Sequence, residues 1–226
     1  MEQPKVLEEL APGVWHSEHD LFLLGAVHFR TRMTVLDTGD GLMLHGPVPL
    51  DEAQAERIAK LGDVKHIVAP NSFHHLYARP AADKFPAAKL WRGEALVTKR
   101  PNLQGEVIVA GSEPSFGETK SLVVGGMPKL DEVVVLHPGT RTLVVTDLVF
   151  NILEYKGWLS GVMFRLTGTH KKLAQSRLLR SAIKQRAAYE QSLQEILSWD
   201  FERVVMAHGE VMERDGKDRL VQVLGG

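Results

Sequence analysis

The sequence contains no cysteine, no long apolar run and no excess of charge of one sign. The absence of cysteine excludes disulfide bonds, thiolate metal sites and cysteine nucleophiles. No apolar run approaches the roughly 20 residues that a membrane-spanning helix needs, and the N-terminal MEQPKVLEELAPGVW lacks the apolar core of a secretory signal. These absences favour a cytoplasmic protein with no membrane partner.

The charges of the chain nearly cancel, with 27 basic and 28 acidic residues among 226. Such a balance gives no global electrostatic basis for binding nucleic acid, which we therefore do not expect as a partner. The composition, 44 % hydrophobic and 24 % charged, is that of an ordinary globular domain. No repeat and no Pro-, Ser- or Gly-rich linker divides the chain, so we expect a single domain over residues 1–226.

Apolar, β-branched runs predict most of the strands. Residues 27–36 and 42–45 flank a turn with an Asp-Gly step and predict an antiparallel pair. Residues 51–61 predict a short helix before a strand at 65–69, and this strand-helix-strand order favours a parallel pair. The remaining expected elements are strands at 87–91, 107–110, 122–124, 132–137, 142–146 and 203–207, a long amphipathic helix at 171–198 and a closing helix at 218–224.

Polar side chains follow three of the predicted strands. His74 and His75 come after 65–69, Asp147 follows 142–146, and His208 follows the last strand. Because ligand sites in α/β sheets favour the carboxyl ends of strands, these residues are candidates for one site. Two or three imidazoles with one carboxylate suit Zn²⁺, Fe²⁺ or Mn²⁺, and they leave coordination positions open for water or substrate.

The same residues also have structural interpretations, which the sequence leaves open. His74 and His75 could cap a helix, Asp147 could accept hydrogen bonds from the amides that follow it, and His208 could be a turn residue. Adjacent side chains on a helix point about 100° apart, so that only one of His74 and His75 would then reach a metal.

Several motifs of the chain resemble the metallo-β-lactamase superfamily. They are the Asp-Thr-Gly and His-Gly-Pro loops, the His-His pair after a buried strand, the stretch TLVVTDLVF and the late MAHGE. The longer segments RMTVLDTGDGLMLHGPVPL, IVAPNSFHHLY and RTLVVTDLVFN are similar to an uncharacterised branch of that superfamily, catalogued as a domain of unknown function. The resemblance covers nearly the whole chain. It implies an α+β fold, a four-layer αβ/βα sandwich in which two packed mixed β-sheets are flanked by helices.

The resemblance also implies a reduced metal site. Pro70 and Ser72 stand where the superfamily motif HxHxDH has its first two histidines, so the motif is degenerate here. The second metal position of the family would be formed by His74 in place of the motif's aspartate, together with His75, Asp147 and His208. The first position would keep only the shared Asp147.

Three further residues are candidates by the same resemblance. Glu132 could replace a missing ligand of the first metal position, with His137 as the second choice. His45 stands where the superfamily has an aspartate that braces the metal loop, which gives it a possible supporting role behind the ligands.

These observations support three hypotheses about function. The first is a hydrolase with one divalent metal ion, zinc first and iron or manganese as alternatives, that activates water on a small ester, thioester or amide. Asp147 and Glu132 are its candidate catalytic residues, with Glu132 or a neighbouring carboxylate as the proton acceptor. The second is a metal-free member of the fold that serves as a binding or scaffolding domain. The third is a mononuclear iron oxygenase.

Two segments of the second half are candidates for contacts with other molecules. Residues 171–186 contain six Lys or Arg and no acid, which predicts a basic amphipathic helix. This helix could face an anionic membrane, nucleic acid or an acidic substrate, or form a solvated outer face. Residues 151–168 are rich in aromatic side chains and predict either a lid over the site or a contact in a homodimer.

Overall fold

The structure is a computed structural model that describes residues 7–23 and 25–225. Its N-terminal half forms a seven-stranded sheet whose spatial order follows the chain order, from β1 to β7. The first four strands are antiparallel neighbours, and β4 to β7 are parallel to one another. The strands are β1 (Glu8–Ala11), β2 (Val14–Leu23), β3 (Val27–Asp37), β4 (Leu42–His45), β5 (Val64–Ala69), β6 (Lys89–Gly93) and β7 (Glu106–Ile108).

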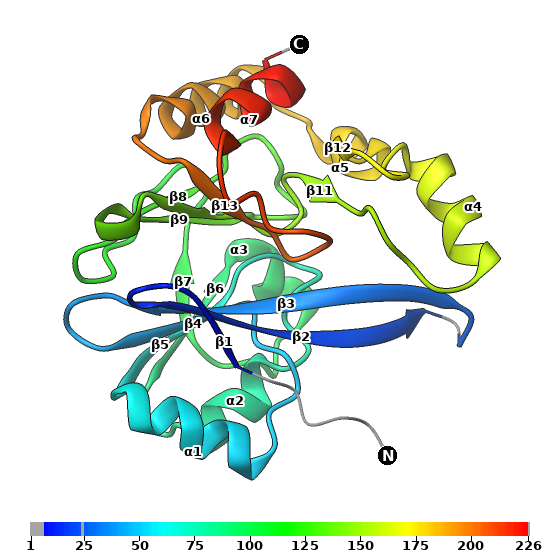
Figure 1. Cartoon of the computed structure of the whole chain (residues 1–226). Coiled ribbons are helices and arrows are strands. Elements are labelled where there is room, and N and C mark those ends of the chain that lie inside the picture. The colour runs from blue at the N-terminus through cyan, green and yellow to red at the C-terminus, as the bar shows by residue number, and fades with distance from the viewer. Residues whose placement is uncertain (1–6, 24, 226) are drawn as a thin grey trace.

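A second sheet of four strands lies above the first in Figure 1, in the order β13-β10-β9-β8. Only β10 and β13 are parallel. A separate two-stranded ribbon pairs β11 with β12. These strands are β8 (Lys120–Val123), β9 (Val133–His137), β10 (Thr142–Val144), β11 (Phe150–Asn151), β12 (Leu173–Ala174) and β13 (Arg203–Val205).

Helices cover the outer face of each sheet, as Figure 1 shows. On one side lie α1 (Glu52–Leu61) and α2 (Ala78–Lys84), and on the other lie α6 (Arg186–Ser198) and α7 (Gly216–Leu224). The remaining helices are α3 (Glu94–Lys99), α4 (Trp158–Thr167), α5 (Arg177–Ala182) and a short 3-10 turn, η1 (Pro138–Thr140). The order helix, sheet, sheet, helix confirms the expected αβ/βα sandwich. No helix in the described ranges is long and apolar enough to cross a membrane.

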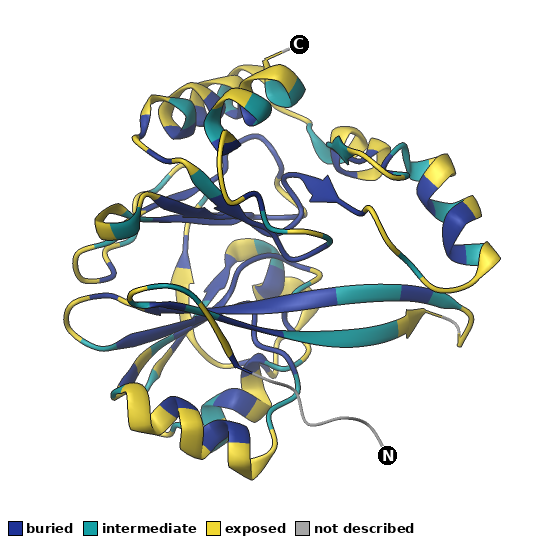
Figure 2. Ribbon diagram, viewed as in Figure 1, coloured by how far each residue is buried: buried dark blue, intermediate teal, exposed yellow. Residues whose placement is uncertain are grey.

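The central strands of both sheets are largely buried (Figure 2), and their alternating side chains pack into two different cores. In β9, Val133 and Val135 face the core between the sheets, whereas Val134 and Leu136 face the core under α6 and α7. In β5, Val68 faces the core between the sheets, and its neighbours on either side face the core over α1 and α2. Because both faces are covered, the loops at the strand ends are where polar groups can gather.

The predicted helix over 171–198 is wrong. The chain instead forms β12, the short α5 and then α6, so the basic segment 171–186 is not one helix. The Ser176 hydroxyl caps α5 by accepting a hydrogen bond from the Leu179 amide at 3.1 Å. Beyond α5, the amides of Lys184 and Gln185 donate to the carbonyl of Gly126, a partner from a distant loop, which interrupts the helix.

Candidate metal centre

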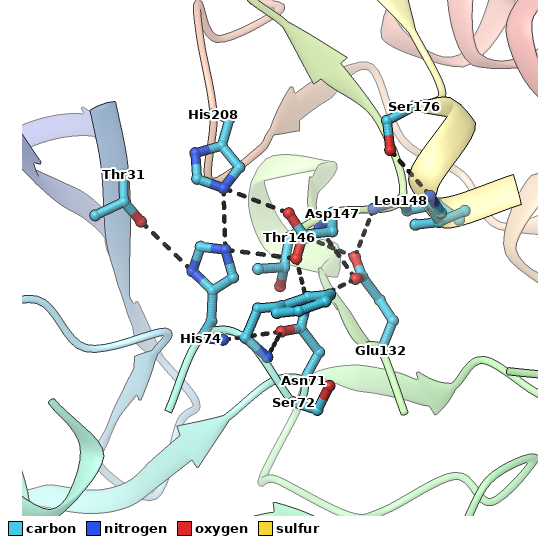
Figure 3. Close-up of polar contacts among 12 residues, drawn as sticks. Thr31, Asn71, Ser72, His74, Glu132, Thr146, Asp147, Leu148, Ser176 and His208 are labelled. Carbon is cyan, nitrogen blue, oxygen red and sulfur yellow. Dashed lines mark hydrogen bonds and ion pairs between the residues drawn. The ribbon is translucent and has the colours of Figure 1, made fainter. Parts of the chain in front are cut away.

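The turn after β5 is built around Asn71, which is fully buried. Its side-chain oxygen accepts hydrogen bonds from the backbone amides of Phe73 at 2.8 Å and His74 at 2.9 Å. Asparagine favours such turns because its short side chain can replace a backbone acceptor. The turn aims the His74 ring away from its own sheet, toward Asp147 and His208 of the other half of the molecule (Figure 3).

Asp147 is held by the backbone around it. The chain leaves β10 and wraps around the carboxylate of Glu132, which accepts hydrogen bonds from the amides of Thr146, Asp147 and Leu148 at 2.7, 3.0 and 3.0 Å. The side-chain amide of Asn71 donates to Oδ2 of Asp147 at 2.8 Å and to Oε2 of Glu132 at 3.1 Å. Asn71 therefore joins the turn that carries His74 to the loop that carries Asp147.

His208 follows β13 and is fixed by its second ring nitrogen. Nδ1 lies 2.7 Å from the carbonyl oxygen of Arg30, an acceptor only, so Nδ1 carries a proton and donates. When the ring is neutral, Nε2 then has its lone pair free, the tautomer that metal sites require. The ring stacks on Phe150 and meets the edge of Phe29, which restricts its rotation.

Gly209 allows the backbone to place His208. It has a φ of +96°, and a Cβ atom there would lie 2.1 Å from the carbonyl oxygen of Asn151. Only glycine tolerates both the backbone angle and the close approach. The buried guanidinium of Arg32 adds a second restraint, because it donates to the carbonyls of Met206 at 2.5 Å and Gly209 at 2.8 Å.

These elements bring His74, Asp147 and His208 together (Figure 3). The two Nε2 atoms are 3.0 Å apart, Nε2 of His208 is 3.3 Å from Oδ1 of Asp147, and Nε2 of His74 is 3.5 Å from Oδ2. Four-coordinate zinc with bonds of about 2.0–2.1 Å separates its ligand atoms by about 3.4 Å. The donor set and its spacing therefore fit a small divalent metal ion.

The charges of the site also suit a cation. Burial alone would raise the pKa of Asp147, but the charge of His74 and hydrogen bonds from His208 and His74 outweigh it and hold the pKa well below its usual range. Two imidazole nitrogens at 3.0 Å need a proton or a cation between them, because two lone pairs repel each other. The ionised carboxylate of Asp147 stabilises either one.

The position of Glu132 does not suit a metal ligand or a group that accepts a proton from water. It is completely buried, and its two oxygens already accept four N–H donors. Burial and the nearby Asp147 raise its pKa against the effect of these donors. Its side chain orders the Asp147 loop from behind, so the geometry does not support the predicted catalytic role.

Known structures resemble this arrangement of sheets and helices along nearly the whole chain. No protein-family model matches the sequence. A metallo-β-lactamase from Pontibacter korlensis is 16 % identical, and the alignment covers 98 % of this chain and 99 % of that one at a TM-score of 0.63. A metallo-β-lactamase from Hirschia baltica is 14 % identical, with 93 % of each chain covered and a TM-score of 0.64. The chain has the metallo-β-lactamase fold.

A third neighbour of the metallo-β-lactamase fold was solved with one zinc ion. FIM-1 from Pseudomonas aeruginosa, in its mono-zinc form, is 15 % identical, covers 97 % of this chain and 94 % of its own, and has a TM-score of 0.63. At such low identity these likenesses establish the fold alone. They confirm the fold that the resemblance of the sequence motifs implies.

A curated protein matches a smaller part of the chain. Acetyl-coenzyme A synthetase of Pseudoalteromonas atlantica (strain T6c / ATCC BAA-1087) is 26 % identical over 114 residues. The match includes 47 % of this chain but only 18 % of the synthetase, so the chain corresponds to a small portion of that protein.

Within the metallo-β-lactamase fold, His75 lies apart from the other three predicted ligands. Its Nε2 atom accepts a hydrogen bond from Nε of Arg100 at 2.7 Å. Burial and the positive charges of Arg100 and Lys99 lower the pKa of His75 to about 4. The structure brings together His74, Asp147 and His208, and it places His75 among cations instead.

His45 and His137 also lie outside the group of three. His45 is buried between the sheets, where Nε2 is 3.0 Å from the carbonyl oxygen of Val133, so it links β4 to β9 next to Glu132. His137 is at the opposite end of β9 from Glu132, and its Nδ1 is 2.8 Å from the hydroxyl of Thr140. His137 is therefore not a substitute ligand for this centre.

Asn71 and Arg32, which hold the loops of the site in place, are not among the site residues predicted from the sequence. A signal for Asn71 was present, because an asparagine after the proline that ends a strand is typical of a side-chain-stabilised turn. Arg32 gave no signal, because nothing in a strand sequence shows that an arginine will be buried against two carbonyls from the other end of the chain.

Proposed function

We propose that this protein is a hydrolase-like enzyme that holds one divalent metal ion, zinc first, between His74, Asp147 and His208. The observation that carries the proposal is the convergence of the two Nε2 atoms and the carboxylate within 3.0–3.5 Å of one another. Two imidazoles and one carboxylate form a known type of catalytic zinc site, which leaves a fourth position for water or substrate. Iron and manganese are alternative ions for the same donors.

The side chains around the site favour one bound metal ion over two. By the resemblance to the superfamily motif, Pro70 and Ser72 stand where two histidines would be, and neither supplies an imidazole. The hydroxyl of Ser72 donates to the carbonyl of Lys129 at 2.7 Å and is committed to holding the loop. The mono-zinc form of FIM-1, a fold neighbour, supports the feasibility of one ion in this architecture.

When bound, the metal would supply Lewis-acid chemistry, which polarises a carbonyl group and makes water more acidic. The residues of this chain prepare the site for it. Asp147 contributes the negative charge, Asn71 fixes its Oδ2 atom, and the carbonyl of Arg30 fixes the tautomer of His208. Phe150 stacks on the His208 ring and Phe29 packs edge-on against it, which holds the ring in place. Small esters, thioesters or amides are the proposed substrates, in a cytoplasmic setting.

Metal analysis combined with an ester panel tests this function. Protein purified without chelator is expected to contain one zinc per chain and to hydrolyse at least one p-nitrophenyl ester or thioester. Removal of the metal should abolish the reaction, and zinc should restore it. His74→Ala should lose both metal and activity, and His75→Ala is the matched control that keeps both.

The alternative function, a metal-free binding domain, makes the opposite prediction. In that case His74, Asp147 and His208 form only a hydrogen-bonded structural cluster, and metal content stays near zero in wild type and in both variants. A bound metal without hydrolysis of any ester, thioester or amide would reject the hydrolase and retain the metal site. Iron in place of zinc, with oxygen consumption, would favour the oxygenase hypothesis.

A further inference from the structure

Helix α4 presents an apolar stripe to solvent. Trp158 is 75 % exposed, Val162 41 % and Leu166 69 %. These residues are spaced by four, so they lie within about 80° of one another around the helix axis. Arg165, also exposed, lies at the edge of the same arc. Single exposed apolar residues are ordinary, but an aligned stripe of this kind marks a contact surface.

The inner face of α4 is firmly packed, which fixes the direction of the stripe. Phe164 is buried and meets the ring of Phe29 with centroids 5.2 Å apart. The hydroxyl of Ser160 accepts a hydrogen bond from the His28 amide at 2.8 Å. Because Ser160, Gly161 and Phe164 are the buried residues of α4, Trp158, Val162 and Leu166 point away from the protein.

Helix α5 extends this surface. A guanidinium nitrogen of Arg177 donates to the carbonyl of Leu166 at 3.1 Å, which places the start of α5 against the end of α4. The next residue, Leu178, is 61 % exposed. Figure 1 shows α4, β12 and α5 together at one side of the molecule, and Figure 2 shows how much of α4 and α5 is exposed. We call residues 155–189 the basic arm.

The charge of the basic arm differs sharply from that of the rest of the chain. It contains eight Lys or Arg and no Asp or Glu, whereas the other residues include 19 Lys or Arg against 28 acids. Lys156 pairs with Asp20, and Arg186 pairs with Glu190. Within the described parts of the chain, the remaining basic residues of the arm form no ion pair, and all are exposed: Arg165, Lys171, Lys172, Arg177, Arg180 and Lys184.

We propose that the basic arm docks the protein on an anionic lipid surface. Unpaired Lys and Arg beside exposed Trp, Leu and Val side chains are the combination by which interfacial helices bind membranes. The cations are attracted to lipid phosphates, and the apolar stripe enters the boundary between headgroups and acyl chains. A nucleic-acid backbone would satisfy the cations alone and leave Val162, Leu166 and Leu178 in water. This proposal revises the expectation of no membrane partner and is independent of the metal site.

Vesicle sedimentation tests the proposal. Full-length protein is mixed with phosphatidylcholine vesicles, with and without about a third of phosphatidylglycerol. We expect binding to the anionic vesicles that is at least ten-fold stronger than to neutral ones and that weakens with salt. The tryptophan emission should shift to shorter wavelength on anionic vesicles, and Trp158→Phe should remove most of that shift.

Two sets of variants test whether vesicles bind to the basic arm or to the remaining surface, each with a control outside the arm. Trp158→Ser with Leu166→Ser should weaken vesicle binding at least ten-fold, whereas Val221→Ser, at a 46 % exposed apolar position on α7, should leave it unchanged. Lys171→Glu with Lys172→Glu should weaken it as well, and Lys60→Glu on α1 is the matched control. All altered side chains are exposed, so the fold should be retained, which circular dichroism checks.

Three results would overturn the proposal. The first is no preference for anionic over neutral vesicles, and the second is equal binding by arm and control variants. The third is a different partner: a homodimer in gel filtration that the Trp158 and Leu166 changes dissolve, or binding to oligonucleotides that exceeds binding to vesicles.

Discussion

Four histidines lie around the loops that end β4, β5 and β13, and they form two contrasting pairs. His74 and His208 each face an oxygen of Asp147, at 3.5 and 3.3 Å. His75 and His45 are buried, and each is hydrogen-bonded to a group other than a carboxylate: His75 accepts a hydrogen bond from Arg100, and Nε2 of His45 lies 3.0 Å from a backbone carbonyl oxygen. Burial lowers the pKa of both to about 4, so both are neutral at pH 7.

The difference teaches that charge surroundings, rather than histidine content or sequence proximity, decide which imidazoles can share a cation. His74 and His75 are neighbours in one turn, yet one faces an anion and the other faces Arg100 and Lys99. A divalent ion next to His75 would be repelled by those two cations. Only the pair at Asp147 combines free nitrogen ligands with negative charge.

The largest expected effect comes from removing the charge that distinguishes the two pairs. Asp147→Asn keeps the shape of the side chain but loses both the charge and a strong ligand. Zinc affinity, measured by competition with a chromophoric chelator, should fall by more than about 100-fold, since even residues behind the ligands contribute 10–100-fold. His75→Gln, which still offers Arg100 an acceptor, should leave the affinity within about three-fold. Equal losses of zinc affinity in the two variants would show that Asp147 does not distinguish one histidine pair from the other.

A smaller loss of affinity is expected from Asn71→Ala. This change removes the turn that aims His74 and the donor to Oδ2 of Asp147, but it leaves all three ligands in place. Zinc affinity should fall about 10–100-fold. Ser72→Ala is the control, because its hydroxyl donates to the carbonyl of Lys129 and not to one of the three ligands. If Asn71→Ala bound zinc as tightly as wild type, the turn would not position His74.

Burial of the second pair should make the free energy of unfolding depend on pH. His45 has a pKa near 6.5 in the unfolded chain. In the folded chain, burial and the charge of His74 lower the pKa of His45 to about 4. The unfolded state therefore binds the proton first, and stability falls as pH drops from 6.5 toward 4. Between pH 7 and pH 4.5, the free energy of unfolding should fall by roughly 2 kcal/mol less in His45→Gln than in the wild type. Urea unfolding at the two pH values measures this difference. An unchanged pH dependence would mean that His45 does not resist protonation.

The smallest effect should come from His137, which belongs to neither pair. His137→Ala removes half-buried contacts with Thr140 and with the backbone of Asp37 at the far end of β9. Stability should change by about 1 kcal/mol or less, and zinc affinity should not change. Reduced zinc binding in His137→Ala would restore this residue as a candidate ligand.

Much of the fold could be predicted because its signals are local. Strands such as Val133–His137 and Thr142–Val144 are largely apolar, and the polar residues that follow β10 and β13, Asp147 and His208, stand out in the sequence. The helix over 171–198 was wrong for a tertiary reason, since the carbonyl of Gly126 takes the amides of Lys184 and Gln185. Local periodicity contains no information about such a distant acceptor.

The choice between His74 and His75 could not be made from the sequence for a similar reason. Both follow the same strand, and only the turn around Asn71 and the position of Arg100, 25 residues away in the chain, separate their surroundings. Glu132 was predicted as a proton acceptor because a carboxylate at that position suited the role. Its four donors, three of them backbone amides of the Asp147 loop, become visible only in the folded chain.

Anomalous diffraction at the zinc edge, on crystals of protein supplied with one equivalent of zinc, tests the central claim most directly. We expect one anomalous peak per chain, lying between Nε2 of His74, Nε2 of His208 and the carboxylate of Asp147. A peak at His75, a second peak near Pro70 and Ser72, or no peak at all would contradict it.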